Sequence, residues 1–164
     1  MPTVKEVYAR FCTTRFPLPK ENEIELLEGR LEIRFPDRYR EYLMSFNGGF
    51  FSNAEIVFPE PITIQWRDGE ATHKQNSLKQ MFGFHSSHPY AEIGRETDIN
   101  LFDDNNPIQL LPIGRTGMGS LLLIDILEGH VGEILIKFPS EGAYPIADNI
   151  DEFFELIEPV ANYQ

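Results

Sequence analysis

The most constraining feature of the sequence is a helix with a fixed stop at residues 35–51, FPDRYREYLMSFNGGFF. A proline suits the first helical position, where the missing N–H is harmless. Apolar residues repeat at helical spacing, and an Asn-Gly-Gly triplet accepts the positive φ angles that end a helix. The residues of this motif are Pro36, Tyr39, Leu43, Asn47, Gly48 and Gly49. The chain must turn sharply after residue 46, and we interpret the glycines as structural, because the turn needs them whether or not anything binds there.

Four further helices are predicted from apolar spacing and capping residues. Residues 3–14 and 21–32 precede the fixed stop, residues 76–83 form a short helix, and residues 149–158 close the chain. Residues 84–109 are irregular, and so long a loop in a compact domain is often functional.

Strands are predicted where apolar and polar residues alternate between turn residues. The predicted strands are residues 55–58, 62–66, 110–113, 120–126 and 131–138, with a hairpin turn at Glu128-Gly129-His130. Pro59 and Pro61 separate the first two. Helices followed by strands and a last helix indicate an α+β fold. We expect a mainly antiparallel twisted sheet with helices packed on one side and a closing C-terminal helix, in one domain over residues 1–164.

The charge of the chain is concentrated in its second half. The net charge is −12, with 11 Lys/Arg against 12 Asp/Glu in residues 1–82 and 3 against 14 in residues 83–164. A negative field repels nucleic acid and anionic membranes and attracts basic proteins. The alternative reading is that an acidic surface only keeps the protein soluble.

Composition also indicates the setting. Cys12 is the single cysteine, so no internal disulfide forms. The start of the chain has no apolar signal-peptide region, and the longest aliphatic run, residues 121–124, is too short to cross a bilayer. We therefore expect a soluble protein of the reducing cytoplasm.

The enzyme and metal motifs that we considered have simpler interpretations. His85 and His88 lie in a predicted loop without ligands at metal-site spacing, and we interpret them as surface histidines. We interpret Cys12 as a half-buried side chain of the first helix rather than as a nucleophile. The segment GRTGMGS (114–120) precedes a strand and lacks the Gly-Lys-Ser/Thr ending, so it reads as a turn and not as a phosphate loop. DDNN (103–106) lacks EF-hand spacing.

Residues 20–158 resemble the SUKH superfamily, the Smi/Knr-like domain. The helix with its fixed stop is similar to the opening motif of that family, and three later segments are similar to its following strands and closing segment: LLPIGRTGMGSLLLID (110–125), VGEILIKF (131–138) and IADNIDEFFELI (146–157). The residues that carry these later matches are Pro112, Gly117, Gly119, Ala147, Asp148 and Phe153. Residues 1–19 lie outside the pattern as an N-terminal extension. The hairpin strand ends in Lys137-Phe138, which departs from the usual ending of the family.

The resemblance implies a non-catalytic binding domain without a cofactor or metal. Bacterial members are mostly cytoplasmic immunity proteins that neutralise a toxin, and fungal members are larger scaffolds that regulate cell-wall synthesis. A single compact domain is more similar to the bacterial type. The expected partner is thus a cognate toxin or another basic protein, and neither nucleic acid nor membrane. A regulatory scaffold or a small-ligand-binding domain of the same fold is the alternative.

The expected binding residues lie on acidic loops of the second half. Our hypothesis is that Asp98, Asp103, Asp104 and Glu128 pair with basic residues of the toxin. Many toxins of this kind act on nucleic acid and carry basic sites, which an acidic protein could cover. Complementary charge would speed encounter and steer selectivity.

Overall fold

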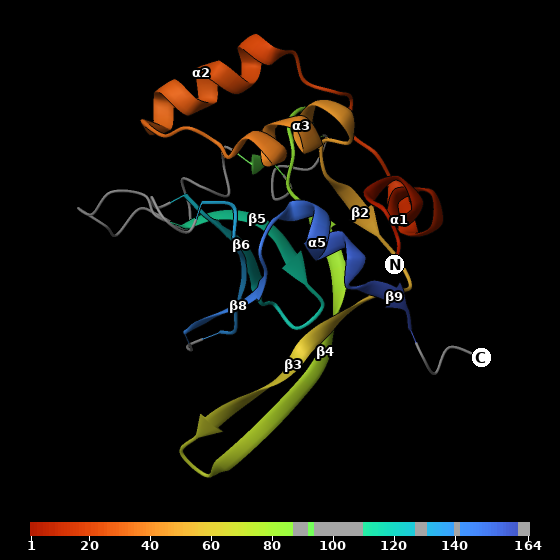
Figure 1. Ribbon diagram of the computed structural model, residues 1–164, viewed down its shortest axis with the longest axis vertical. Helices are drawn as coiled ribbons and strands as arrows, with labels where there is room; N and C mark the ends of the chain where they lie inside the picture. Colours follow the sequence, from red (N-terminus) through yellow and green to blue (C-terminus); the bar gives the residue numbers. More distant parts are fainter. Residues whose placement is uncertain (87–91, 94–109, 127–130, 140–141, 161–164) are drawn as a thin grey trace.

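The computed structural model describes residues 1–86, 92–93, 110–126, 131–139 and 142–160 (Figure 1). Its helices are α1 (Val4–Phe11), α2 (Glu21–Leu31), α3 (Asp37–Ser45) and α5 (Ile150–Glu155). Its strands are β1 (Cys12–Thr14), β2 (Gly49–Phe51), β3 (Ala54–Trp66), β4 (Gly69–Met81), β5 (Leu110–Thr116), β6 (Leu121–Asp125), β7 (Ile134–Lys137), β8 (Ala143–Ala147) and β9 (Ile157–Pro159).

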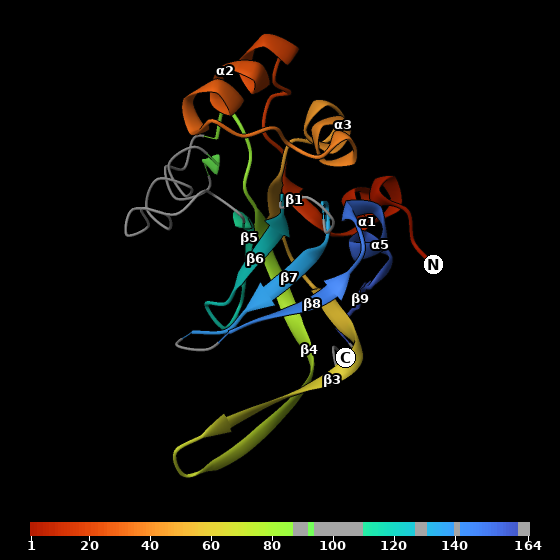
Figure 2. The ribbon, with the colours of Figure 1, turned by 60° about the vertical axis from the view of Figure 1, so that its left-hand side comes forward.

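The strands form one antiparallel sheet in the order β1-β2-β4-β5-β6-β7-β8, and β3 pairs with both β4 and β9. The four described helices gather at one end of the molecule, whereas the β3–β4 hairpin extends toward the other end (Figures 1 and 2). This arrangement confirms the α+β fold with a mainly antiparallel sheet. β8 ends the strand order, so the outer edge of β8 pairs with no strand of the described chain.

The core forms where the helices meet the sheet. Helix α1 contributes Val7, Tyr8 and Phe11, which are all buried. Helix α5 adds Phe153 and Phe154, both fully buried. Thus residues before position 20 supply part of the core, and apolar burial of this kind is the main favourable term in folding.

The predicted helix at residues 76–83 is wrong, because this segment is the end of β4. Asn76, Leu78 and Gln80 are buried on alternate positions, as in a strand. β3 pairs with β4 up to Ser77, and β5 pairs with it from Leu78 onward. Hydrogen bonds from neighbouring strands thus outweigh the local helical preference.

Two proline residues also lie differently from the prediction. The segments 55–58 and 62–66 belong to one strand, β3, and its register against β4 shifts between Val57 and Ile62. Pro59 and Pro61 lie in this irregular part of β3. Proline lacks the N–H that a ladder needs, so an irregular stretch is where a strand tolerates it.

Both terminal helices are shorter than predicted because short strands take over. The predicted helix 3–14 ends at Phe11, and Cys12–Thr14 pair with β2 as β1. The closing helix is α5, and residues 157–159 leave it to pair with β3 as β9. Strands β2, β8 and β9 are not predicted from the sequence, since these segments of three to five residues show no clear alternation of apolar and polar residues.

Three buried tyrosines join α1 and α3, and they make stability depend on alkaline pH. The hydroxyls of Tyr8 and Tyr42 share a hydrogen bond of 2.5 Å, and Tyr8 also donates to the carbonyl of Gly48. Burial raises the pKa of Tyr8, Tyr39 and Tyr42 above its ordinary value. A raised pKa in the folded state means that stability is full below the ordinary pKa of about 10 and falls as pH rises above it.

We therefore expect the free energy of unfolding to fall steeply above about pH 10. A pH titration of tyrosinate absorbance should show some of the six tyrosines ionising near that pH and the others only as the protein unfolds. In a Tyr42→Phe variant, the free energy of unfolding should fall less steeply above that pH, because one buried hydroxyl fewer can ionise on unfolding. Ionisation of all tyrosines in one reversible step near pH 10, with the fold intact, would contradict this expectation.

Candidate functional site

The Asn-Gly-Gly stop of α3 is a buried junction. Asn47 is fully buried with φ of 56°, and its side-chain amide donates to the carbonyls of Pro17 at 2.6 Å and Phe84 at 2.7 Å. Its side-chain oxygen accepts the Phe84 N–H at 2.7 Å. One side chain therefore ties the end of α3 to the segment before α2 and to the segment after β4.

The glycines of this junction are held by close backbone packing. Gly48 has φ of +75°, and a Cβ there would lie 2.5 Å from the carbonyl oxygen of Met81. Gly49 has φ of +141°, and a Cβ there would lie 2.6 Å from the carbonyl oxygen of Thr14. Because both glycines face protein backbone, the geometry supports their interpretation as structural residues.

The first residues of the motif are structural as well. Pro36 lies at the N-cap of α3, one position before the first helical residue, and Tyr39 and Leu43 are fully buried. The motif thus places Tyr39 and Leu43 in the core, whereas its Asn-Gly-Gly end contacts the segments around β1 and β4. The four acidic residues that we predicted to bind a partner, Asp98, Asp103, Asp104 and Glu128, lie outside the described residues, as does the predicted turn at residues 128–130.

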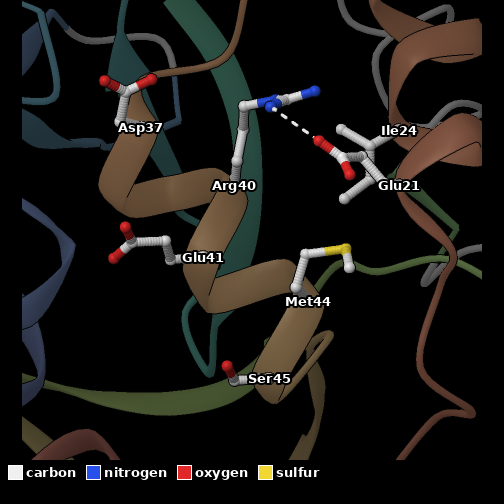
Figure 3. Close-up of a pocket in the computed structure, with 7 residues that line it drawn as sticks. All are labelled: Glu21, Ile24, Asp37, Arg40, Glu41, Met44 and Ser45. Carbon is white, nitrogen blue, oxygen red and sulfur yellow. Dashed lines mark ion pairs between the residues drawn. The ribbon is translucent and has the colours of Figure 1, made fainter.

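A groove of about 400 Å³ lies between α2 and α3 (Figure 3). Arg40 extends from α3 toward Glu21 of α2, with 4.0 Å between the charged atoms, and binds Glu28 at 3.0 Å. Glu28 also accepts the Phe35 N–H at 2.7 Å. Glu41 points away from α2 in this view. The lining of this groove thus holds one basic residue, Arg40, among three acidic residues.

A smaller groove of about 320 Å³ lies where the N-terminal ends of α3 and α5 meet. Its lining includes Asp37, Arg38 and Asp148. Arg38 also reaches Asp151 of α5, with 3.2 Å between the charged atoms. Here too one arginine lies among the acidic side chains.

The third groove, of about 620 Å³, is different in charge. We name it the β3–β8 groove; it is lined by residues 59–63 of β3, residues 144–148 at the end of β8, and Glu152 of α5. Ile62 and Ile146 are buried beneath the surface, whereas Glu60, Asp148 and Glu152 are exposed. No Lys, Arg or His is among these lining residues. An apolar floor with acidic side chains around it suits an apolar segment that carries positive charge.

Sequence reasoning missed the β3–β8 groove, although a signal was present. Pro59, Pro61 and Pro145 stand inside strand-like runs, and proline in such a run indicates an edge strand or an irregular one. β8 is indeed an edge strand, and the prolines of β3 lie where its pairing is interrupted. What the sequence could not indicate is that these two edges lie across from each other.

Among the histidines and the cysteine that we considered, His85 and Cys12 lie in the described part of the chain. His85 lies 2.6 Å from Glu23 of α2. The backbone N–H of Lys20 and then the His85 side chain hold the pKa of the Glu23 carboxyl below its ordinary value. Cys12 lies in β1 rather than in a helix, and burial raises its thiol pKa, which disfavours the thiolate that a nucleophile needs. His88 and residues 103–106 lie outside the described residues.

Two further findings concern the motifs excluded above. Within the described ranges, no group of three or more His, Cys, Asp or Glu residues is placed to hold a metal ion. Residues 117–119 form the turn between β5 and β6, so GRTGMGS leads into a strand as predicted.

None of the described helices is long and apolar enough to span a membrane.

The profile of the SMI1 / KNR4 family (SUKH-1) matches residues 18–156. No curated protein sequence matches the chain.

Proposed function

The chain belongs to the SMI1 / KNR4 family (SUKH-1), and from this membership we propose that it is a non-catalytic protein-binding module. Its role is that of a cytoplasmic immunity protein, which binds a cognate toxin with a basic domain and neutralises it. The resemblance noted in the sequence supports this role, since single-domain bacterial members act in this way.

The observation that carries the proposal is the uneven charge. Residues 83–164 hold 14 acidic against 3 basic residues. Two acidic side chains of that half, Asp148 and Glu152, line the β3–β8 groove without a basic neighbour among its lining residues. Such a surface raises the rate of encounter with a basic protein and repels nucleic acid. A toxin that acts on nucleic acid carries the complementary charge at its own site.

The first test is capture of the partner. The tagged full chain is used to capture proteins from the source cells at low and at high salt, and bound proteins are identified by mass spectrometry. We expect one stoichiometric partner with a basic domain, whose activity is blocked in the complex. The absence of any partner from cells that express both proteins would contradict the proposal.

A second test measures the contribution of the acidic loops. We expect the combined variant Asp98→Asn, Asp103→Asn, Asp104→Asn and Glu128→Gln to associate with the captured toxin about tenfold more slowly at low salt, because steering by complementary charge is lost. Its association rate should also depend less on salt. Stopped-flow mixing of the purified proteins over a range of salt concentrations measures both effects.

The matched control removes the same charge elsewhere. Glu25, Glu41, Asp68 and Glu70 are exposed residues of the first half, and their amide variants change the net charge equally. The control should associate at nearly the rate of the unchanged chain. If both variants slow association equally, net charge alone explains the slower rate, and the position of the four loop residues does not matter.

The alternative is a regulatory scaffold or a small-ligand-binding domain of the same fold. The grooves of about 320, 400 and 620 Å³ favour the small-ligand-binding domain, because small-molecule sites have volumes of this order. Several weak protein partners, or a small molecule that purifies with the chain, would identify this alternative.

A further inference from the structure

We propose that the β3–β8 groove is an arginine-binding site, which takes an extended, arginine-bearing segment of the partner protein. The inference rests on the proposed function, since it names the part of a basic partner that this surface recognises.

The first reason is an excess of hydrogen-bond acceptors. Three of the lining residues, Pro59, Pro61 and Pro145, have no backbone N–H to donate. Glu60, Asp148 and Glu152 add three carboxylates, which only accept when ionised. One Glu152 oxygen already accepts the Asp148 N–H at 3.2 Å, which leaves the second oxygen of that carboxylate for an occupant. The side chains that can donate are those of Thr63 and Tyr144, and the Thr63 hydroxyl already shares a hydrogen bond with Thr72 at 3.0 Å. An occupant rich in donors and free of acceptors matches this lining, and arginine has five N–H donors and no acceptor.

The second reason is that the prolines disfavour a strand as the occupant. The outer edge of β8 has no partner strand in the described chain, and β9 pairs with β3 only from Ala54 to Ile56. Open edges normally invite strand addition. Proline in both walls of the groove interrupts the row of donors that a continuous ladder requires. Side chains of the occupant, rather than its backbone, therefore make the contacts.

A second copy of the chain is a poor occupant. Each copy carries a net charge of −12, and the groove lining contains no basic residue. Like charges brought together at an interface cost free energy. The acidic residues around the groove select a cationic partner instead.

The third reason favours arginine over lysine. Tyr144 lines the groove, and its ring contacts that of Phe138 with 6.1 Å between the centroids, which restrains its orientation. The planar guanidinium of arginine stacks on aromatic rings and binds carboxylates through two parallel hydrogen bonds. Lysine has a compact charge and does neither. The buried Ile62 and Ile146 offer apolar contact to the arginine stem and to an adjacent apolar residue.

The test uses the full chain and a defined probe, the blocked peptide acetyl-Gly-Arg-Leu-Arg-Gly-amide, with lysine and citrulline versions of it. Binding is followed by amide NMR shifts of the groove residues during titration. We expect the arginine peptide to bind at least about threefold more tightly than the lysine peptide. Lysine keeps the positive charge, but it cannot form two parallel hydrogen bonds to a carboxylate or stack a planar group on Tyr144. The citrulline peptide, which is neutral, should bind at least about tenfold more weakly than the arginine peptide.

Two variants locate the effect. The combined variant Glu60→Gln, Asp148→Asn and Glu152→Gln should weaken arginine-peptide binding about tenfold or more. The control Glu25→Gln, Glu41→Gln and Glu70→Gln changes the net charge equally at exposed sites outside the groove lining, and should bind within about twofold of the unchanged chain. Tyr144→Leu should abolish the preference for arginine over lysine.

The inference would be overturned if the arginine peptide did not bind at millimolar concentration, or if all three peptides bound equally. An equal loss of affinity for the arginine peptide in the groove variant and the control variant would also overturn it. The outcome is separable from that of the proposed function. A captured toxin that binds the groove variant as tightly as the unchanged chain would leave the immunity role intact and reject the arginine site. Arginine-selective binding in a chain that captures no toxin would support the site and reject the immunity role.

Discussion

Replacing Asn47 with alanine should destabilise the protein by about 3–5 kcal/mol, because several buried hydrogen bonds depend on this one side chain. The variant leaves the Phe84 N–H and the carbonyls of Pro17 and Phe84 without the partners that they have now. An unpaired buried polar group costs about 1–3 kcal/mol. Alanine also tolerates the φ of 56° at this position less well than asparagine does. Urea unfolding followed by circular dichroism measures the difference.

Asn53 is the matched control for this prediction. It also has a left-handed backbone, with φ of 59°, but it is exposed. Asn53→Ala therefore carries the conformational cost without the buried hydrogen bonds, and we expect about 1–2 kcal/mol. Equal losses in the two variants would show that the Asn47 amide contributes nothing beyond its backbone preference.

A larger effect is expected at Gly48, where alanine should cost about 4 kcal/mol or more and could prevent folding. A Cβ there would lie 2.5 Å from the carbonyl oxygen of Met81 and 2.7 Å from that of Phe82. These atoms belong to the main chain at the end of β4, so no side-chain rotation relieves the contact. Overpacking costs about 1–3 kcal/mol or more, and a positive φ adds about 1–2 kcal/mol for a residue with a Cβ.

Gly119 separates the two contributions, since it has the same φ of +75° and a Cβ there would meet nothing within 4 Å. Gly119→Ala should lose only about 1–2 kcal/mol and keep the native fold. The comparison of the two alanine variants by thermal unfolding, with soluble yield as the measure where Gly48→Ala does not fold, tests the packing of the junction. A Gly48→Ala variant as stable as Gly119→Ala would contradict the close approach of the α3 stop to β4.

Particular elements show how far sequence patterns reach. Helices α2 and α3 follow from apolar residues at helical spacing, and the end of α3 follows from its Asn-Gly-Gly triplet. The short strands β6 and β7 lie within apolar runs that predict strands. Local residues at 76–83 favour a helix, but pairing with β2, β3 and β5 makes residues 76–81 part of a strand. Residues 157 and 158 continue the helical pattern of α5 in the sequence, and only pairing with β3 makes β9 a strand.

The candidate site also combines features that the sequence predicts with features that depend on long-range contacts. The acidic residues of the β3–β8 groove are visible in the sequence, but Glu60 and Asp148 lie 88 positions apart in a chain of 164 residues. Only the tertiary arrangement of the sheet brings the interrupted part of β3 across from the outer edge of β8. Spacing along the sequence carries no information about such an approach, because it depends on long-range pairing.

Local features can be predicted from the amino-acid sequence: where α3 ends, why Asn47, Gly48 and Gly49 stand there, the excess of acidic residues, and the resemblance to a family of binding domains. Each depends on backbone preferences or on charge, which neighbouring residues or simple counts reveal. The tertiary structure alone decided that Asn47 bonds Pro17 and Phe84, that residues 76–81 are a strand, and that three carboxylates surround one apolar groove. These features arise from contacts between distant segments, whose free energy no local pattern contains.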